Sequence, residues 1–153
     1  MGYILLIIGI FLTELQIKNY IEKNKTEDID EPALKNRILI RKFHNKGALL
    51  NIGNKKRKMV AAISLAFSFG MIVVFILSLT TRGNHMFKLG MALLLGGAFS
   101  NTYDRLKRKY VVDYFSFQTH FPRITAIVFN ISDFCIAVGA AIAAIVVILN
   151  PDI

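Results

Sequence analysis

Cysteine, proline and acidic residues are all scarce in this sequence, and each scarcity has a consequence. The single cysteine, Cys135, excludes an intramolecular disulfide and a cysteine-based metal cluster. Internal repeats and low-complexity segments are absent, and 153 residues is the length of one domain. No aspartate or glutamate occurs from Pro32 to Tyr103, so the few acids that follow are informative.

Apolar side chains, in contrast, are abundant. Hydrophobic residues make up 54% of the chain, and the charged residues are collected between long apolar runs. This pattern is typical of membrane spans and their loops. The net charge of +9 could indicate a nucleic-acid partner, but the chain lacks a soluble scaffold with groove-reading elements. We therefore expect that the protein binds no nucleic acid and that the basic loops contact membrane phospholipid headgroups.

Four apolar runs approach or exceed the length of roughly 20 residues that a helix needs to cross a bilayer. They cover about 2–20, 59–79, 86–103 and 124–149. No small-residue cleavage site follows the first run, so we expect a retained span and not a removed signal peptide. Glycines in the third run and alanines in the fourth favour close helix packing. The sequence thus predicts an all-α membrane protein with four transmembrane helices in a single membrane domain over 1–153.

The polar segment between the first two runs has a different pattern. Acids cluster before Pro32, which indicates an irregular stretch. The segments 37–44 and 48–52 are rich in β-branched or aliphatic residues, and an Asn-Lys-Gly sequence joins them. This arrangement predicts a small β-hairpin or β-sheet outside the membrane, within about 35–57.

Asp113 and Asp133 are the strongest candidates for catalysis, because each is a single acid in apolar surroundings. An ionised side chain within a span is costly unless it has a partner or water, and Asp113 lies close to Asp133 along the chain. Two neighbouring carboxyls do not both ionise easily, so one keeps a proton while the other acts as a base. The residues alone leave open that Asp133 only bonds a neighbouring helix and that Asp113 only caps one.

Other polar side chains in or near the spans have simpler explanations. Cys135 has no basic group placed to form its thiolate, so we expect it to pack between helices. His44 and His120 have no carboxylate or metal-ligand spacing around them. Glu14 and Lys18 are four residues apart, a spacing that lets opposite charges meet on a helix.

Three ordered motifs in the second half of the chain resemble those of the lipoprotein signal peptidases. In that family a glycine pair precedes an Asn-x-x-Asp-Arg element, a Val-x-Asp-Phe element follows, and an Asn-x-Ala-Asp element lies in the last span. The matching segments here are GGAFSNTYDR at 96–105, VVDY at 111–114 and FNISD at 129–133. The segments 14–18 and 44–48 match the family's Asp-Gln-x-x-Lys and Asn-x-Gly-Ala elements more loosely.

The resemblance implies a multi-pass protein of the bacterial cytoplasmic (inner) membrane with a small extracytoplasmic β-structure. It implies an aspartic endopeptidase, with no cofactor and no metal, that cleaves diacylglyceryl-modified prolipoproteins just before the lipidated cysteine. By the same match Asp113 and Asp133 are the catalytic pair. Asn45, which the match gives a supporting role, is explained equally well as a turn residue. The implied supporting or substrate-binding residues are Asn45, Gly47, Asn101, Arg105, Asn130, Asp104 and Glu14.

The chain departs from the family pattern at several positions. Glu14 replaces an aspartate, Tyr114 a phenylalanine and Ser132 an alanine. Ser100 and Lys109 replace glycines. Both catalytic carboxylates remain, so the departures indicate a divergent member or paralogue whose substrate range is open.

Charge distribution and resemblance disagree about orientation. Twelve lysines and arginines lie in 18–58 and five in 105–123, against two, Arg82 and Lys88, in and directly after the loop between the second and third runs. The positive-inside tendency places the first and third loops in the cytoplasm, whereas the resemblance places them outside. We follow the resemblance, because three ordered motifs are more specific than a charge count.

A non-enzymatic function is the alternative that the composition allows. A four-helix membrane protein that binds lipid or a partner, or a small proton-coupled transporter, could also carry a buried acid. Replacement of Asp113 separates these functions, because an aspartyl-pair enzyme loses turnover whereas a scaffold tolerates asparagine there.

Overall fold

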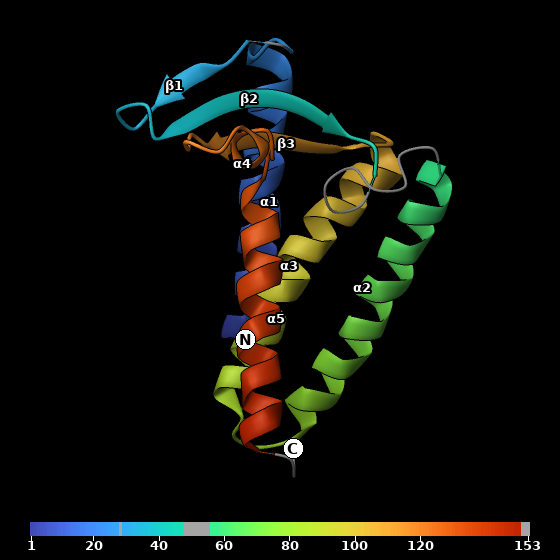
Figure 1. The fold of residues 1–153 in the computed structure, drawn as a ribbon. Helices are drawn as coiled ribbons and strands as arrows, with labels where there is room; N and C mark the ends of the chain where they lie inside the picture. Colours follow the sequence, from blue (N-terminus) through green and yellow to red (C-terminus); the bar gives the residue numbers. More distant parts are fainter. Residues whose placement is uncertain (28, 48–55, 151–153) are drawn as a thin grey trace.

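The computed structural model describes residues 1–27, 29–47 and 56–150. Within these ranges, long helices stand side by side and the strands lie across one end of them (Figure 1). The elements are α1 Gly2–Asn24, β1 Glu31–Ala33, β2 Ile38–Asn45, α2 Arg57–Thr80, α3 His85–Lys107, β3 Val111–Phe117, α4 Pro122–Thr125 and α5 Ile131–Leu149.

Among the described residues, three helices are long and apolar enough to cross a membrane, namely α1, α2 and α5. Many of their large apolar side chains are exposed, including Phe69 on α2 and Ile148 on α5. Hydrocarbon chains of lipid, unlike water, are a favourable environment for such surfaces. The expectation of a mostly helical membrane protein with a small sheet is therefore confirmed. Helix α3 is about as long as the others but is not among the helices that are apolar enough to cross a membrane by this criterion.

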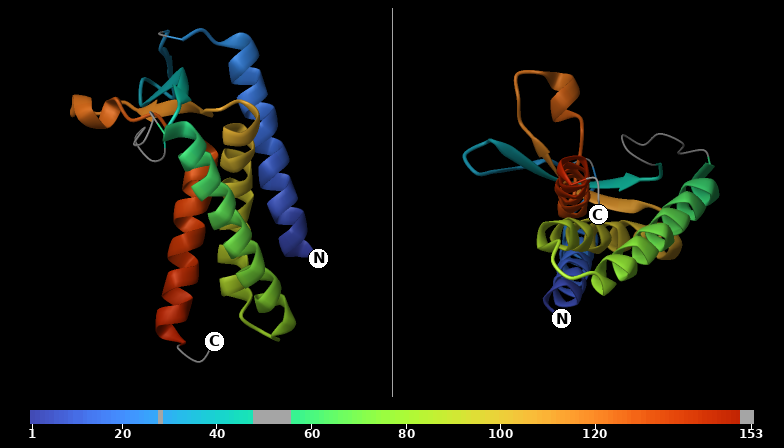
Figure 2. Two further views of the ribbon diagram at one scale, coloured as in Figure 1. Left: turned by 90° about the vertical axis from the view of Figure 1, so that its right-hand side faces the viewer. Right: turned by 90° about the horizontal axis from the view of Figure 1, so that it is seen from below.

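Helix α3 is the centre of the bundle. It packs against α1, α2 and α5, and the view along the bundle shows it between α1 and α5 (Figure 2). Its contact with α5 is close because glycines face each other: a Cβ on Gly139 would lie 2.5 Å from the Gly90 carbonyl oxygen. A Cβ on Gly97 would lie 2.4 Å from the Ser132 carbonyl oxygen. The close packing predicted from the small residues is thus confirmed.

The three strands form an antiparallel sheet in the order β1-β2-β3. Asn45, at the end of β2, pairs with Val111 at the start of β3. The register between β2 and β3 shifts between Ile40 and Phe43. Val112 and Tyr114 of β3 are buried against α1, which fixes the sheet on the end of the bundle. The sheet therefore brings the end of β2 close to the start of β3 above the helices.

This sheet differs from the hairpin expected from the sequence. The first expected arm is β2, but its described partners are β1 and β3; the second arm, 48–52, lies outside the described residues. The segment around Pro32, expected to be irregular, contributes an edge strand, a position that tolerates the missing N–H of proline. β3 was missed because its partner is distant in the sequence.

Helix α5 begins later than the expected fourth span. Residues 122–125 form the separate helix α4, and α5 starts at Ile131 behind an Asn130 cap. The Asn130 side chain accepts from the Asp133 backbone N–H at 3.0 Å, and the Asp133 carboxylate accepts from the Asn130 N–H at 3.1 Å. This reciprocal cap fixes the helix start. Asp133 therefore lies in the first turn of α5, beside the sheet, and its expected place in the interior of the span is wrong.

We expect Gly139→Ala to destabilise the protein by about 1–3 kcal/mol, because the added methyl would force α3 and α5 apart. Thermal unfolding in detergent should show a lower melting temperature than that of the parent. Gly70→Ala in α2 is the matched control, since a Cβ there meets nothing within 4 Å. Equal melting temperatures for the two variants would contradict the proposed role of this contact.

Candidate active site

A cavity of about 460 Å³ lies where α2, α3, α5 and the sheet meet. Its charged and amide side chains are Asn45 from β2, Asn101 and Arg105 from α3, Asp113 from β3 and Asp133 from α5. Most of the remaining lining is apolar and comes from α2, α5 and residues 127–129. Charged and amide side chains from four elements thus converge on one space.

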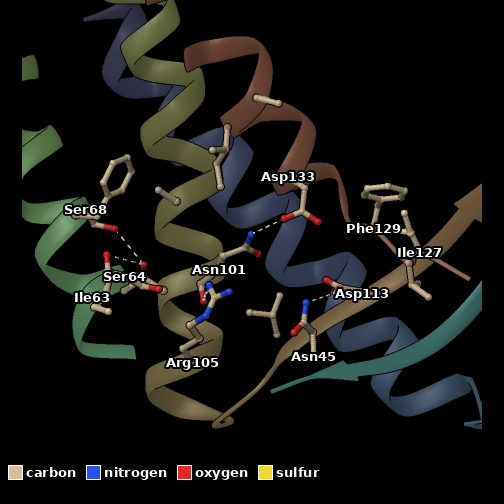
Figure 3. A pocket seen from close by; sticks show the side chains of 17 residues that line it. Asn45, Ile63, Ser64, Ser68, Asn101, Arg105, Asp113, Ile127, Phe129 and Asp133 are labelled. Carbon is tan, nitrogen blue, oxygen red and sulfur yellow. Dashed lines mark hydrogen bonds between the residues drawn. The ribbon is translucent and has the colours of Figure 1, made fainter. Parts of the chain in front are cut away.

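Asp113 is buried at the strand end of the cavity, with only 2% of its surface exposed. Asn45 donates to its Oδ2 at 3.0 Å, and Asn130 donates to its Oδ1 at 2.6 Å. The pairing of Asn45 with Val111 across the sheet brings the Asn45 amide within reach of this carboxyl. Figure 3 shows the Asn45 bond, which fixes the carboxyl from the β2 side.

Asp133 approaches the same space from the first turn of α5. Asn101 donates to its Oδ1 at 2.9 Å, also drawn in Figure 3, and the Asn130 backbone N–H donates to its Oδ2. Asn130 therefore contacts both carboxyls, one through its side chain and one through its backbone. This single residue ties the start of α5 to strand β3.

The carboxyl of Asp113 has an unusually high pKa. Burial in the protein, followed by the negative charge of Asp133, raises the pKa of Asp113 to about 7, and the bonds from Asn45 and Asn130 oppose this increase only in part. Near neutral pH, Asp113 can therefore hold a proton in the presence of an ionised neighbour. A proton donor next to a base is the arrangement required for general acid–base chemistry on a carbonyl group.

Arg105 supplies the positive charge of the cavity. Its Nη2 donates to the Gly47 carbonyl oxygen at 3.2 Å, and its Nη1 donates to the Asn101 carbonyl oxygen at 3.3 Å. Its buried Nε has no hydrogen-bond partner in the part of the chain that the structure describes. The guanidinium thus connects the segment after β2 to α3.

Lys18 lies behind the cavity and is completely buried. Its Nζ is 3.1 Å from Asp104 Oδ2 and 3.5 Å from Glu14 Oε2, and it donates to Asn101 Oδ1 at 2.8 Å. The Glu14–Lys18 contact predicted from their spacing is confirmed. Because the Asn101 oxygen accepts from Lys18, its amide nitrogen is free to donate to Asp133.

The structure divides the residues selected from the sequence into two groups. Asp104 and Glu14 lie behind the cavity, where they surround Lys18. The others line the cavity or bond directly to residues that do: Asn45, Gly47, Asn101, Arg105, Asp113, Asn130 and Asp133. The sequence marked Tyr114 and Ser132 only as departures from the family motifs and gave them no role; in the structure both contact Glu14.

The surroundings of His44 include contacts that its sequence neighbours do not show. Its Nε2 is 2.7 Å from Glu22 Oε1 and its Nδ1 is 2.7 Å from Glu27 Oε1, so carboxylates distant in sequence do approach it. Within the described ranges, no group of three or more His, Cys, Asp or Glu side chains could hold a metal ion.

Comparisons with known proteins give the family and the fold of the chain. A family model described as signal peptidase (SPase) II matches residues 6–149. A lipoprotein signal peptidase of Clostridium acetobutylicum is 33% identical over 84% of this chain and 80% of its own length. One from Halothermothrix orenii is 32% identical over 93% and 91%. Two solved structures described as bacterial membrane enzymes share the fold, with TM-scores of 0.84 and 0.77 at 19% and 22% identity; each comparison covers 99% of this chain and at least 90% of the other.

We expect the folded protein to lose stability as the pH rises from about 4 to about 7. The pKa of Asp113 is raised from 3.8 to about 7 on folding, so the folded state keeps a proton that the unfolded state has lost. The resulting stabilisation is fully present below pH 3.8 and is lost as the pH rises through about 7. Asp113→Asn, neutral at every pH, should flatten the dependence of the melting temperature on pH between about pH 4 and about pH 7.

The control for this measurement is Asp30→Asn, which removes an exposed carboxylate that is absent from the cavity lining. It should keep the pH dependence of the parent. An unchanged slope in the Asp113→Asn variant would contradict the assignment.

Proposed function

The chain belongs to the signal peptidase II family, whose members are aspartic-type peptidases that release signal peptides from prolipoproteins, and we propose that Asp113 and Asp133 are its catalytic carboxylates. The observation that carries this proposal is the convergence of the two acids on one cavity, where Asn130 contacts both. The raised pKa of Asp113 supports it, because a pair that shares one proton holds an acid and a base together near neutral pH.

In the proposed reaction, the ionised carboxylate of Asp133 accepts a proton from a water molecule while the water oxygen attacks the scissile carbonyl carbon. Protonated Asp113 donates a hydrogen bond to the carbonyl oxygen, on which negative charge develops. The C–N bond then breaks, and the leaving amine takes a proton from the carboxyl pair. The products are a signal peptide with a new carboxylate and a lipoprotein with a free α-amino group on its lipidated cysteine.

The amides around the pair have a proposed supporting role. Asn45, Asn101 and Asn130 each donate to a carboxylate oxygen and add no charge, so they orient the pair without neutralising it. Arg105 lies in the cavity wall, where its guanidinium could donate to a substrate carbonyl.

The walls of the cavity fit a substrate that comes from the bilayer. Ile63 and Phe67 of α2 lie in the lining together with Ile136 and Ala137 of α5. Both helices are apolar enough to lie in a membrane. We therefore propose that a diacylglyceryl-modified prolipoprotein places its lipid-bearing cysteine between α2 and α5, and that membrane phospholipid fills this space when the substrate is absent.

We also propose that α3 is a fourth transmembrane helix. It has 23 residues, equal in length to α1, and it is surrounded by the three apolar helices, which shield its polar side chains from lipid. The proposed protein is a single multi-pass domain of the bacterial cytoplasmic membrane, with the sheet on the extracytoplasmic side.

Cleavage of a purified diacylglyceryl-modified prolipoprotein in proteoliposomes tests the catalytic assignment. The parent should release the signal peptide. Asp113→Asn and Asp133→Asn should each lower kcat by at least about 10³-fold, because each variant lacks one of the two carboxyls that accept and donate protons in the reaction. Gly70→Ala is the control and should cleave at the parent rate. Parental activity in either Asp variant would contradict the proposed mechanism, and an inactive folded parent would contradict the proposed substrate.

Labelling of single cysteines with a membrane-impermeant reagent tests the orientation. In a Cys135→Ala background, Lys25→Cys beyond the end of α1 should react from the extracytoplasmic side. Gly83→Cys between α2 and α3 should react only after the cytoplasmic side is opened. The opposite pattern would show that the positive-inside tendency decides the topology.

A further inference from the structure

The carboxylate of Glu14 on α1 bonds to both elements that carry the proposed catalytic acids. The Tyr114 hydroxyl donates to Glu14 Oε1. The Ser132 hydroxyl and backbone N–H donate to Glu14 Oε2 at 2.7 and 3.2 Å. Tyr114 directly follows Asp113 on β3, and Ser132 directly precedes Asp133 on α5. One buried side chain therefore connects the immediate neighbours of both acids.

The same contacts complete the cap of α5. The first N–H groups of a helix have no partner inside it, and together they form the positive end of the helix dipole. Here the Ile131 N–H donates to the Tyr114 hydroxyl oxygen at 3.1 Å, and the Ser132 N–H donates to Glu14. A carboxylate of α1 and a hydroxyl of β3 thus hold the first turn of α5, the turn that carries Asp133.

We propose that Glu14 is a positioning residue for the peptidase reaction, and that together with Tyr114 and Ser132 it sets the relative placement of Asp113 and Asp133. Glu14, Tyr114 and Ser132 are 1%, 5% and 0% exposed, and the three are absent from the cavity lining. Successive side chains of a strand point to opposite faces, so Tyr114 faces α1 while Asp113 faces the cavity. The three side chains act from behind the acids and do not touch the substrate.

This inference rests on the proposed function and predicts a specific kinetic effect. A small misplacement of catalytic groups can lower the rate of the chemical step about 10²-fold. Substrate binding in the cavity does not involve Glu14, Tyr114 or Ser132. Loss of any one of these bonds should therefore lower kcat and leave KM nearly unchanged.

Steady-state cleavage of the diacylglyceryl-modified prolipoprotein by Tyr114→Phe, Ser132→Ala and Glu14→Gln tests the role of Glu14. Each variant should lower kcat by about 10- to 100-fold with KM within about twofold of the parent. Because the three side chains act as a unit, the double variant Glu14→Gln/Tyr114→Phe should lower kcat by about as much as the more impaired of the two single variants. Gln16→Ala, exposed on the same helix, is the control and should match the parent.

Thermal unfolding of every variant identifies the folded fraction, and Tyr114→Phe and Ser132→Ala keep the test valid if Glu14→Gln does not fold. Parental kcat in both folded variants, whatever their melting temperatures, would overturn the inference and leave the proposed function intact. A higher KM with parental kcat would indicate a substrate contact and would overturn it as well. An inactive parent would overturn the proposed function and this role with it.

Discussion

The interaction on which the site depends most is the one around the buried ammonium of Lys18. Lys18 is completely buried, and Glu14 and Asp104, its two carboxylate partners, are each 1% exposed. A buried charge that loses its partner destabilises a protein by about 3–5 kcal/mol, so these side chains must remain together in the folded state. Since Lys18 belongs to α1 and Asp104 to α3, their ion pair joins the two helices, whereas Glu14 contacts Lys18 within α1.

Two chains of hydrogen bonds lead from this cluster to the proposed catalytic acids. Lys18 orients the Asn101 amide, and this amide donates to Asp133. Glu14 binds Tyr114 and Ser132, the neighbours of the two acids. The charged side chains of Lys18 and Glu14, which lie outside the cavity, therefore orient residues that contact or adjoin the two acids inside it. The Lys18 ammonium bonds to neither acid directly, but its positive charge opposes part of the increase in the pKa of Asp113.

Three departures from the family motifs acquire a common explanation in this arrangement. Glu14, Tyr114 and Ser132 appear in the sequence as separate replacements, but in the structure they bond to one another. A hydroxyl on Tyr114 and another on Ser132 each give the Glu14 carboxylate a donor that phenylalanine and alanine lack. The close approach of α3 and α5 at Gly97 and Gly139 holds Ser132 in place, which links the packing of the bundle to the geometry of the acids.

The sequence by itself determined the membrane class, the family and the identity of the candidate acids, because apolar run length and the order of short motifs are local properties of the chain. It also predicted the Glu14–Lys18 contact, since a spacing of four is set by helix geometry. Only the tertiary structure decided the partners of β2, the start of α5 at Ile131 and the grouping of Tyr114 and Ser132 with Glu14. These features depend on contacts between residues far apart in sequence, and such contacts leave no periodic pattern in a single chain.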